Sequence, residues 1–284
     1  MRRRWPLRAW AGVLLAALAL ALAAMAEAQE RRPRILLSDD DGIAAAGLLA
    51  VYAELVKIGD VTVAAPAENQ SGVGHGITYQ EPLMVREIEP LVKTDAPAGK
   101  WYRIAARPAS CVRLALTSLL TEKPDLVVSG INRGENTGYV IYMSGTLGAA
   151  REAAFDGIPS IAASQVISPA MDYKPGAAFV GRLAVDVLRR GVPRGTFLSV
   201  NIPEGEIKGV KIVPHALTEG VNTYERGVNP RQETYFWSSW AEPTSEALDN
   251  DAGAVRHGYI AVTPLRVDSN DAPAQRELEG WNLK

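Results

Sequence analysis

Cysteine and histidine are scarce in this sequence of 284 residues, which contains one cysteine and three histidines. The single cysteine, Cys111, excludes internal disulfide bonds and a zinc site built from thiolates. The histidines are too scattered for a zinc motif with two histidines one helical turn apart. The sequence also lacks a large excess of one charge sign, because it has 30 Lys and Arg and 32 Asp and Glu. Its charge therefore gives no indication of nucleic-acid wrapping. A metal site here therefore needs mostly oxygen ligands.

The first 28 residues have the composition of a secretory signal peptide. Four arginines precede an Ala- and Leu-rich run over Ala9–Met25, and Ala26-Glu27-Ala28 fits a cleavage site with small residues. We expect a periplasmic or secreted bacterial protein with no stable membrane span after cleavage; the alternative is an uncleaved leader that anchors the chain in the inner membrane. Cleavage removes four arginines and Glu27, so the formal net charge changes from -2 to -5 over the remaining 256 residues.

Segments of strand type and helix type alternate along the first two thirds of the mature chain. The predicted strands are Arg34–Ser38, Val61–Ala65, Leu126–Ser129, Ile158–Ala163 and Thr196–Val200, and the predicted helices are Leu48–Val56, Ala109–Leu120, Ser144–Phe155 and Ala177–Arg190. This alternation is typical of an α/β fold with a mainly parallel sheet covered on both faces. Extended segments are expected around Ile77–Val85 and Trp101–Ala105, and a long polar loop over Gly130–Met143.

The periodicity weakens after Asn201, where turn-rich loops separate short apolar segments. We expect a β-rich C-terminal appendage on the same domain, with strands at Val210–Val213, Thr234–Trp237 and Tyr259–Val262.

Unusual polar residues follow three of the predicted strands. They form the segments Asp39–Gly42, Asn69–Gly72 and Gly130–Asn136. Ligands of open α/β sheets bind outside the carboxyl ends of the strands, and clustered carboxylates are costly unless a cation or several donors neutralise them. Asp, Asn and Ser oxygens suit a hard cation such as Mg²⁺ or Mn²⁺. The alternative is a solvated acidic turn beside two ordinary polar loops.

A helix is predicted to begin at Ser144-Gly145-Thr146. Ser144 is a natural N-cap, and the free N–H groups of a helix start bind anions, so this segment is a candidate phosphate site beside the cation; a plain structural cap is the alternative. The Gly72-x-Gly74-x-Gly76 stretch is no dinucleotide fingerprint, because it leads into extended chain and not into a helix. His75 within it is either an acid for the leaving group or an exposed loop residue.

These motifs together resemble the SurE family of survival-protein nucleotidases, over about Arg34 to Asp268. Residues 35–43 read ILLSDDDGI where the family typically has ILLSNDDGI, and residues 124–136 read PDLVVSGINRGEN. Further matches are Ala65-Pro66 through Ser71-Gly72, Tyr142-Met143-Ser144-Gly145-Thr146, and Gly258-Tyr259 with Thr263-Pro264-Leu265. The match is specific because several motifs agree in the same order.

The resemblance implies a divalent-metal phosphomonoesterase that hydrolyses nucleoside 5′-monophosphates, and 3′-monophosphates as a further option, to nucleoside and phosphate. It also implies a Rossmann-like, doubly wound core spanning one domain (residues 34–284), with a C-terminal arm from about residue 201 that forms a homodimer or homotetramer. One divalent cation per subunit, Mg²⁺ or Mn²⁺, would be held by Asp40, Asp41, Ser71 and Asn132. The phosphate side would be Asn136, Ser144, Gly145 and Thr146, and the catalytic residues would be Asp40, Asp41 and Asn136.

Three departures from the family pattern stand in this sequence. Asp39 replaces the usual Asn and adds a carboxylate beside the metal; Ser110 replaces the Asp that usually precedes the cysteine; and most family members lack a leader. Aromatic candidates for stacking on the base, which are equally candidates for core or interface residues, are Tyr139, Tyr142, Tyr224, Tyr235, Phe236 and Trp237.

Two other functions stay open on the sequence alone. Asp39-x-Asp41-Gly42 also fits the start of a haloacid-dehalogenase-type phosphatase with an aspartyl-phosphate on Asp39, although no later acidic metal pair follows. A non-catalytic periplasmic protein that binds nucleotides or phosphate is the other alternative.

Overall fold

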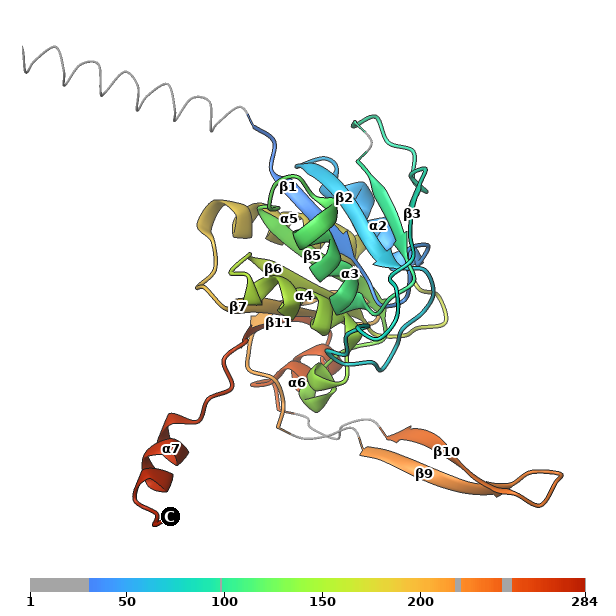
Figure 1. Cartoon of the computed structure of the whole chain (residues 1–284), viewed down its shortest axis with the longest axis vertical. Coiled ribbons are helices and arrows are strands. Elements are labelled where there is room, and N and C mark those ends of the chain that lie inside the picture. The colour runs from blue at the N-terminus through green and yellow to red at the C-terminus, as the bar shows by residue number, and fades with distance from the viewer. Residues whose placement is uncertain (1–30, 98, 218–220, 242–246, 284) are drawn as a thin grey trace, which may run out of the picture. The chain divides into compact units, whose positions relative to one another are not determined.

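Strand β1 (Arg34–Ser38) lies in the middle of a nine-stranded sheet, where helices cover both of its faces (Figure 1). Its apolar residues are continuous and not alternating, as expected for a strand that is buried on both sides. The structure, a computed structural model, describes residues 31–97, 99–217, 221–241 and 247–283. The predicted signal peptide lies outside the described residues.

The six central strands run parallel. In spatial order they are β4 (Trp101–Ile104), β2 (Asp60–Pro66), β1, β5 (Leu126–Arg133), β6 (Ser160–Gln165) and β7 (Thr196–Ile202). At one edge, β3 (Val85–Ile88) pairs antiparallel with β4. At the other edge, β11 (Tyr259–Arg266) pairs antiparallel with β7 and parallel with β8 (Gly209–Ile212). The carboxyl ends of the parallel strands therefore share one edge of the sheet, as the site prediction requires.

Two layers of helices pack on opposite faces of this sheet. One face carries α2 (Ala46–Leu55) and α5 (Lys174–Arg190), which bury residues such as Leu48 and Val180 against Leu37 and Val128. The other face carries α3 (Pro108–Leu114), its continuation η1 (Ala115–Leu119), and α4 (Gly145–Phe155). Leu36 and Val127 point to this second face, because successive side chains of a strand alternate between the two faces.

Cys111 of α3 belongs to that second core cluster and has no exposed surface. Its thiol donates a weak hydrogen bond to the carbonyl of Ala106, with a sulfur–oxygen distance of 3.7 Å. Burial raises the pKa of this thiol well above its usual range. Cys111 therefore behaves as a small apolar core residue.

The predicted α/β class with a mainly parallel sheet and an additional antiparallel sheet near the C-terminus is confirmed. The boundary between the two sheets differs from the prediction. Strands β8 and β11 join the main sheet, and only β9 (Val221–Val228) and β10 (Thr234–Ala241) form a separate hairpin. The short helix α6 (Asp251–Arg256) packs against β11, and α7 (Ala272–Glu279) follows it along the chain; neither helix was predicted.

The structure changes the extent of two other predicted segments. The polar loop over Gly130–Met143 is wrong at its start, because β5 continues to Arg133 with a shift of register between Ser129 and Asn132. In the extended segment expected around Ile77–Val85, strand pairing begins only at Val85.

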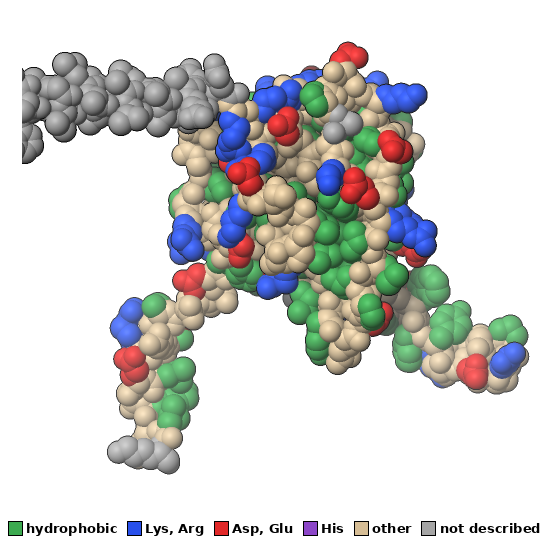
Figure 2. Space-filling model, turned by 45° about the horizontal axis from the view of Figure 1, so that its top comes forward, with side chains coloured by type: hydrophobic (Ala, Val, Ile, Leu, Met, Phe, Trp, Pro, Cys, Tyr) green, Lys and Arg blue, Asp and Glu red, His purple; other side chains and the backbone are tan. Residues whose placement is uncertain are grey.

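Apolar side chains are exposed on the β9–β10 hairpin and on α7 (Figure 2). Phe236 and Trp237 of β10 are exposed by 61% and 72%, and Trp281 after α7 by 57%. No helix in the described ranges is long and apolar enough to cross a membrane.

Candidate active site

The acidic segment after β1 is buried at its start and half-buried at its end. Asp39 has no exposed surface, Asp40 is 3% exposed, and Asp41 is partly exposed. Burial, followed by repulsion from Asp40 and Asp41, raises the pKa of Asp39 well above its usual range. Burial also raises the pKa values of Asp40 and Asp41, although hydrogen bonds to both carboxylates oppose this. Negative charge is thus held at the sheet edge at a considerable cost in solvation.

The segment after β2 is attached directly to this acidic segment. The backbone N–H of Gln70 donates to the carbonyl of Asp40 at 2.7 Å, and the side-chain amide of Asn69 donates to Oδ1 of Asp41 at 3.1 Å. Asn69 in turn accepts a hydrogen bond from the N–H of Ser71, which closes a tight turn. Ser71 is therefore an exposed residue on a turn fixed beside Asp40 and Asp41.

The carboxyl end of β5 is attached to the same carboxylate from the other side. The backbone N–H of Arg133 donates to Oδ2 of Asp41 at 2.6 Å. The preceding residue, Asn132, is 8% exposed, and its amide nitrogen donates to the carbonyl of Gly134 at 2.7 Å. This hydrogen bond fixes the amide so that its carbonyl oxygen is the atom left to bind a cation.

The start of α4 meets the acidic segment at Asp40. Ser144 caps the helix by accepting a hydrogen bond from the N–H of Leu147 at 3.2 Å, as predicted. The Thr146 hydroxyl donates to Oδ1 of Asp40 at 2.5 Å. A Cβ on Gly145 would lie only 2.9 Å from the Asp40 side chain, so glycine is needed for this close approach. The structure thus brings Asp40, Gly145 and Thr146 together.

Asn136 is held by a different set of contacts, on the β6 and β7 side of the edge. It is 5% exposed, and its amide nitrogen donates to the Ser164 hydroxyl at 2.7 Å. Its backbone N–H donates to the side-chain oxygen of Asn201 at 2.7 Å, and its carbonyl accepts from the amide of Asn201 at 3.2 Å. These bonds fix Asn136 at the sheet edge without a direct hydrogen bond to Asp40 or Asp41.

The donor set fits a hard divalent cation. No Lys or Arg in the described ranges forms an ion pair with Asp39, Asp40 or Asp41, and the second oxygen of Asp39 is buried without a hydrogen-bond partner. Within those ranges, no three Asp, Glu, His or Cys side chains are grouped to hold a metal. A cation at this edge therefore needs further oxygen ligands beside the carboxylates, and Ser71 and Asn132, which the family resemblance implies as ligands, lie on the two attached segments.

Asp39, the departure from the family pattern, is sequestered. Its Oδ1 accepts a hydrogen bond from the N–H of Asp40 at 2.8 Å, and none of its surface is exposed. Its raised pKa favours the protonated carboxyl, which has the shape of the Asn side chain that the family pattern has here.

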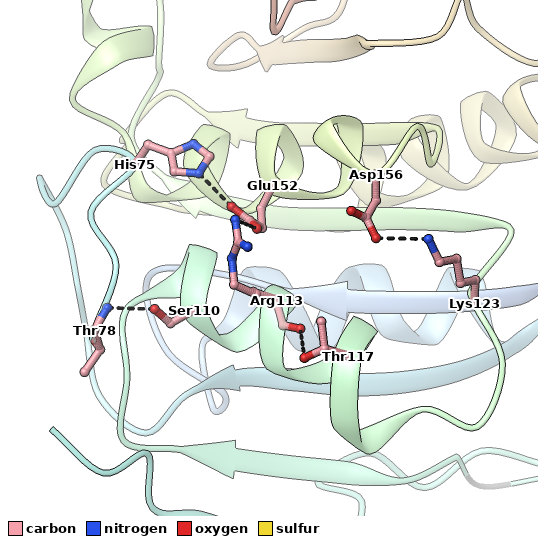
Figure 3. Close-up of polar contacts among 8 residues, drawn as sticks. All are labelled: His75, Thr78, Ser110, Arg113, Thr117, Lys123, Glu152 and Asp156. Atoms are coloured by element: carbon pink, nitrogen blue, oxygen red, sulfur yellow. Dashed lines mark hydrogen bonds and ion pairs between the residues drawn. The ribbon is translucent and has the colours of Figure 1, made fainter. Parts of the chain in front are cut away.

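His75, within the Gly-rich loop, belongs to a network of polar contacts with helices α3 and α4 (Figure 3). Its Nε2 is 2.8 Å from Glu152 of α4, and Arg113 of α3 contacts the other oxygen of the same carboxylate at 2.5 Å. Glu152 is only 4% exposed. The neighbouring glycines let the loop approach α4, since a Cβ on Gly148 would lie 2.5 Å from the carbonyl of Gly74. His75 is therefore a partly buried loop residue and not an exposed one, whereas its role as an acid for the leaving group stays a prediction.

Ser110 contributes to the same attachment (Figure 3). Its hydroxyl accepts a hydrogen bond from the N–H of Thr78 at 2.7 Å. The replacement of the usual Asp thus keeps an oxygen acceptor that holds the end of the Gly-rich loop on α3.

Sequence reasoning missed several residues of this edge. Ser164 and Asn201 lie at the carboxyl ends of β6 and β7, so the rule that found the other segments would have found them. Tyr173, before α5, gave no sequence signal; burial raises the pKa of its phenol, and the charges of Asp41 and Asp39 raise it further, which places the ring near the acidic segment.

Comparisons with known proteins agree with this geometry. The family described as survival protein SurE matches residues 35–222. A protein of Chlorobaculum tepidum named 5′-nucleotidase SurE is 40% identical over 264 residues, which cover 89% of this chain and 96% of that protein. A protein of the same name from Moorella thermoacetica is 39% identical over 251 residues, covering 87% and 95%. The crystal structure of a SurE protein from Aquifex aeolicus matches the fold with a TM-score of 0.76 at 35% identity, over 87% of this chain and 98% of that one.

Proposed function

The chain belongs to the SurE family, and from that premise we propose that it hydrolyses nucleoside 5′-monophosphates to a nucleoside and inorganic phosphate. The observation that carries the proposal is Asp40, a 3% exposed carboxylate that joins the acidic strand end to the start of α4 through Thr146. Relatives that are about 40% identical over nearly nine-tenths of the chain are named 5′-nucleotidases, which supports this substrate class. Whether 3′-monophosphates are also substrates is decided by the same assay.

The phosphate of the substrate would lie at the N-terminus of α4. The free N–H groups of the first turn and the helix dipole attract anions, and Ser144 fixes the start of the helix. These groups, with Asn136, would stabilise the negative charge on the phosphoryl oxygens as the bond to the leaving group breaks. Because they are already fixed by hydrogen bonds, little reorganisation is needed during the reaction.

One divalent cation per subunit, Mg²⁺ or Mn²⁺, is part of the proposal, held by Asp40, Asp41, Ser71 and Asn132. Such a cation supplies positive charge to a phosphoryl oxygen and lowers the pKa of a water molecule. Asn69 and Arg133 orient the Asp41 carboxylate toward this position through their hydrogen bonds. Asn132 is fixed in the same way by Gly134.

Asp40 is the residue placed to handle the proton of the attacking water. Burial raises its pKa, which brings it closer to the value that suits a general base at neutral pH. The Thr146 hydroxyl donates to Oδ1 of Asp40 and so orients the carboxylate. Asp39, the second residue that the sequence suggested for this role, has no surface that water or substrate can reach.

The same burial argues against the aspartyl-phosphate alternative. A phosphoryl group must contact the carboxylate that attacks it, and Asp39 is 0% exposed. Trapping with beryllofluoride tests this directly, and a stable adduct on Asp39 would favour that alternative. A non-catalytic binding protein is the remaining alternative, and tight nucleotide binding without phosphate release would favour it.

The decisive experiment measures phosphate release by the chain that begins at Gln29, over a matrix of metals and substrates. We expect release from nucleoside monophosphates with Mg²⁺ or Mn²⁺ and none with a chelator. Asp40→Asn should lower kcat by about 10² to 10⁴-fold, because the amide cannot accept the proton. The matched control is Asp186→Asn, which changes an exposed carboxylate on α5 paired with Arg190. An Asp40→Asn variant with wild-type activity would overturn the assignment.

Two further parts of the proposal concern assembly and location. The exposed aromatic side chains of the β9–β10 hairpin support an arm that forms a homodimer or homotetramer, which sedimentation measures. Export to the periplasm or beyond rests on the composition of residues 1–28, and fractionation with N-terminal sequencing tests both export and cleavage.

A further inference from the structure

Three aromatic rings lie together immediately before the start of α4. Tyr139 and Tyr142 belong to η2 (Gly138–Tyr142), and His215 follows β8. The ring centroids of the two tyrosines are 6.5 Å apart, and His215 is 6.3 Å from each of them. The Tyr142 and His215 rings meet edge to face at 89°, so they are not stacked on one another. Tyr142 is 60% exposed, which leaves a large part of its ring accessible.

A buried carboxylate holds this aromatic cluster together. Asp251, at the start of α6, has no exposed surface and accepts hydrogen bonds from the N–H of Gly138 and the N–H of Ala216. Gly138 is the first residue of η2, and Ala216 is next to His215. One side chain therefore fixes both of the segments that carry the rings, although they are about 75 residues apart in sequence.

The cluster is also fixed relative to the proposed phosphate position. Tyr142 is two residues before the cap Ser144, and the N–H groups of Met143 and Ser144 both donate to the carbonyl of Val140. The carbonyl of Met143 accepts from the N–H of Gly74 at 2.8 Å, which attaches the same turn to the Gly-rich loop. Two residues of chain span at most about 7 Å, so the Tyr142 backbone lies one sugar-sized step from the helix start.

We propose that this aromatic cluster, with the exposed Tyr142 ring as its main surface, is the stacking platform for the base of the nucleotide substrate. The inference rests on the proposed function. Stacking on an aromatic ring accepts every base, because each base has a π-face, so the cluster favours nucleotides over other phosphomonoesters without choosing among bases. Asp251 is a positioning residue in this arrangement and does not touch the substrate.

A competing location for the nucleoside is the cavity of about 650 Å³ between α6 and the ends of β6 and β7. Five of its twelve lining residues are charged, namely Glu135, Glu204, Glu206, Lys208 and Arg256. Such walls suit hydrogen bonding to particular polar groups more than stacking. We favour the aromatic cluster because its accessible ring continues directly into the cap of α4.

The experiment compares nucleoside monophosphates with ribose 5-phosphate, which has the same sugar and phosphate but no base. Tyr142→Ala should lower kcat/KM for AMP, GMP, CMP and UMP by about 10 to 100-fold, the range for loss of one stacked base. It should leave kcat/KM for ribose 5-phosphate within about twofold of wild type. Tyr142→Phe keeps the ring and should keep wild-type values. Tyr79→Ala, which removes a 75% exposed tyrosine outside the cluster, is the matched control.

Inhibition measurements give a second readout that does not depend on turnover of ribose 5-phosphate. Tyr142→Ala should raise the inhibition constant of free adenosine by a similar factor and leave that of inorganic phosphate unchanged. Equal losses for AMP and ribose 5-phosphate, or no loss for either, would overturn the inference while the phosphatase remained. The inference would also be overturned if Tyr142→Ala changed the oligomeric state but left the ratio of kcat/KM for AMP to kcat/KM for ribose 5-phosphate unchanged. A change of that ratio in Glu135→Gln alone would overturn it too. If the wild-type protein released phosphate from no substrate, the proposed function and the inference would fail together.

Discussion

The contact between Gly145 and Asp40 gives the sharpest test of how the site is assembled. A methyl group on Gly145 would lie 2.9 Å from both Cβ and Oδ2 of Asp40 and 3.2 Å from Cγ of Pro108. Ordinary van der Waals contact begins near 3.4 Å, so Asp40 or the start of α4 must move by about half an ångström in Gly145→Ala. Asp40 is buried two residues after the end of β1 and Gly145 begins a buried helix, so neither moves easily.

The expected consequences for stability and for activity differ in size. Overpacking of this kind costs about 1–3 kcal/mol, and alanine in the first turn of the helix returns up to about 1 kcal/mol, which leaves a net loss of roughly 0–3 kcal/mol. Activity should suffer more, because a shift of about 1 Å in a catalytic group can cost 10²-fold, and the bond from Thr146 to Asp40 is disturbed as well. We expect kcat/KM to fall by about 10 to 100-fold.

Denaturant unfolding and phosphate release measure the two effects on the same preparation. Gly181→Ala, within α5, is the matched control, since its new Cβ would meet Cβ of Glu54 at 3.2 Å, which is also a tight contact but involves no residue of the acidic segment. Gly181→Ala should keep wild-type activity. Wild-type kcat/KM in Gly145→Ala would refute the view that the helix start and Asp40 must be held at this separation.

Two further predictions concern residues outside the acidic segment. His75→Ala removes the contact of the Gly-rich loop with Glu152, and it should weaken the apparent affinity for Mg²⁺ several-fold because Ser71 precedes that loop. The control Lys123→Ala, which breaks an exposed pair with Asp156, should leave the Mg²⁺ affinity unchanged. Equal Mg²⁺ affinity in the wild type and both variants would contradict this positioning role of His75. Burial raises the pKa of Asp251, so the folded state binds the proton of this carboxyl more tightly than the unfolded state does. Asp251 therefore makes the free energy of unfolding fall as the pH rises from about 4 through the raised pKa. In Asp251→Asn this contribution should disappear from denaturant titrations above about pH 4, and an unchanged pH slope would show that Asp251 is not its source.

The parallel core could be predicted from the sequence because its signals are local. Continuous apolar runs such as Arg34–Ser38 and periodic segments such as Ala177–Arg190 identify their own structures, and both are confirmed with ends shifted by three residues or fewer. The placement of β8 and β11 in the main sheet could not be predicted, because which strands pair over such a distance depends on tertiary contacts. The continuation of β5 to Arg133 was hidden in the same way, since its polar residues read as loop until their pairing with β6 is seen.

For the site, strand ends and the helix cap could be predicted, and the bonds between them could not. The carboxyl-end rule brings Asp41 and Asn132 to one edge, and the structure joins their segments through Arg133. The hydroxyl of Thr146 was assigned to phosphate on the resemblance, whereas the structure shows it donating to Asp40. The contact of His75 with Glu152 could not be predicted, because Glu152 and its second partner, Arg113, lie on helices far away in sequence. The metal ligands themselves stay a prediction.

The reactivity of the single thiol, Cys111, is a measure of local opening of the folded protein. Only the thiolate reacts rapidly with alkylating reagents, and a cysteine with no exposed surface and a raised pKa offers almost none of it in the folded state. Labelling therefore requires α3 to separate from the sheet. The adjacent residue, Ser110, holds the Gly-rich loop through Thr78, so the same separation removes one support of the loop that follows Ser71. The alkylation rate of Cys111 thus measures how often α3 separates from the sheet, and no probe has to be introduced.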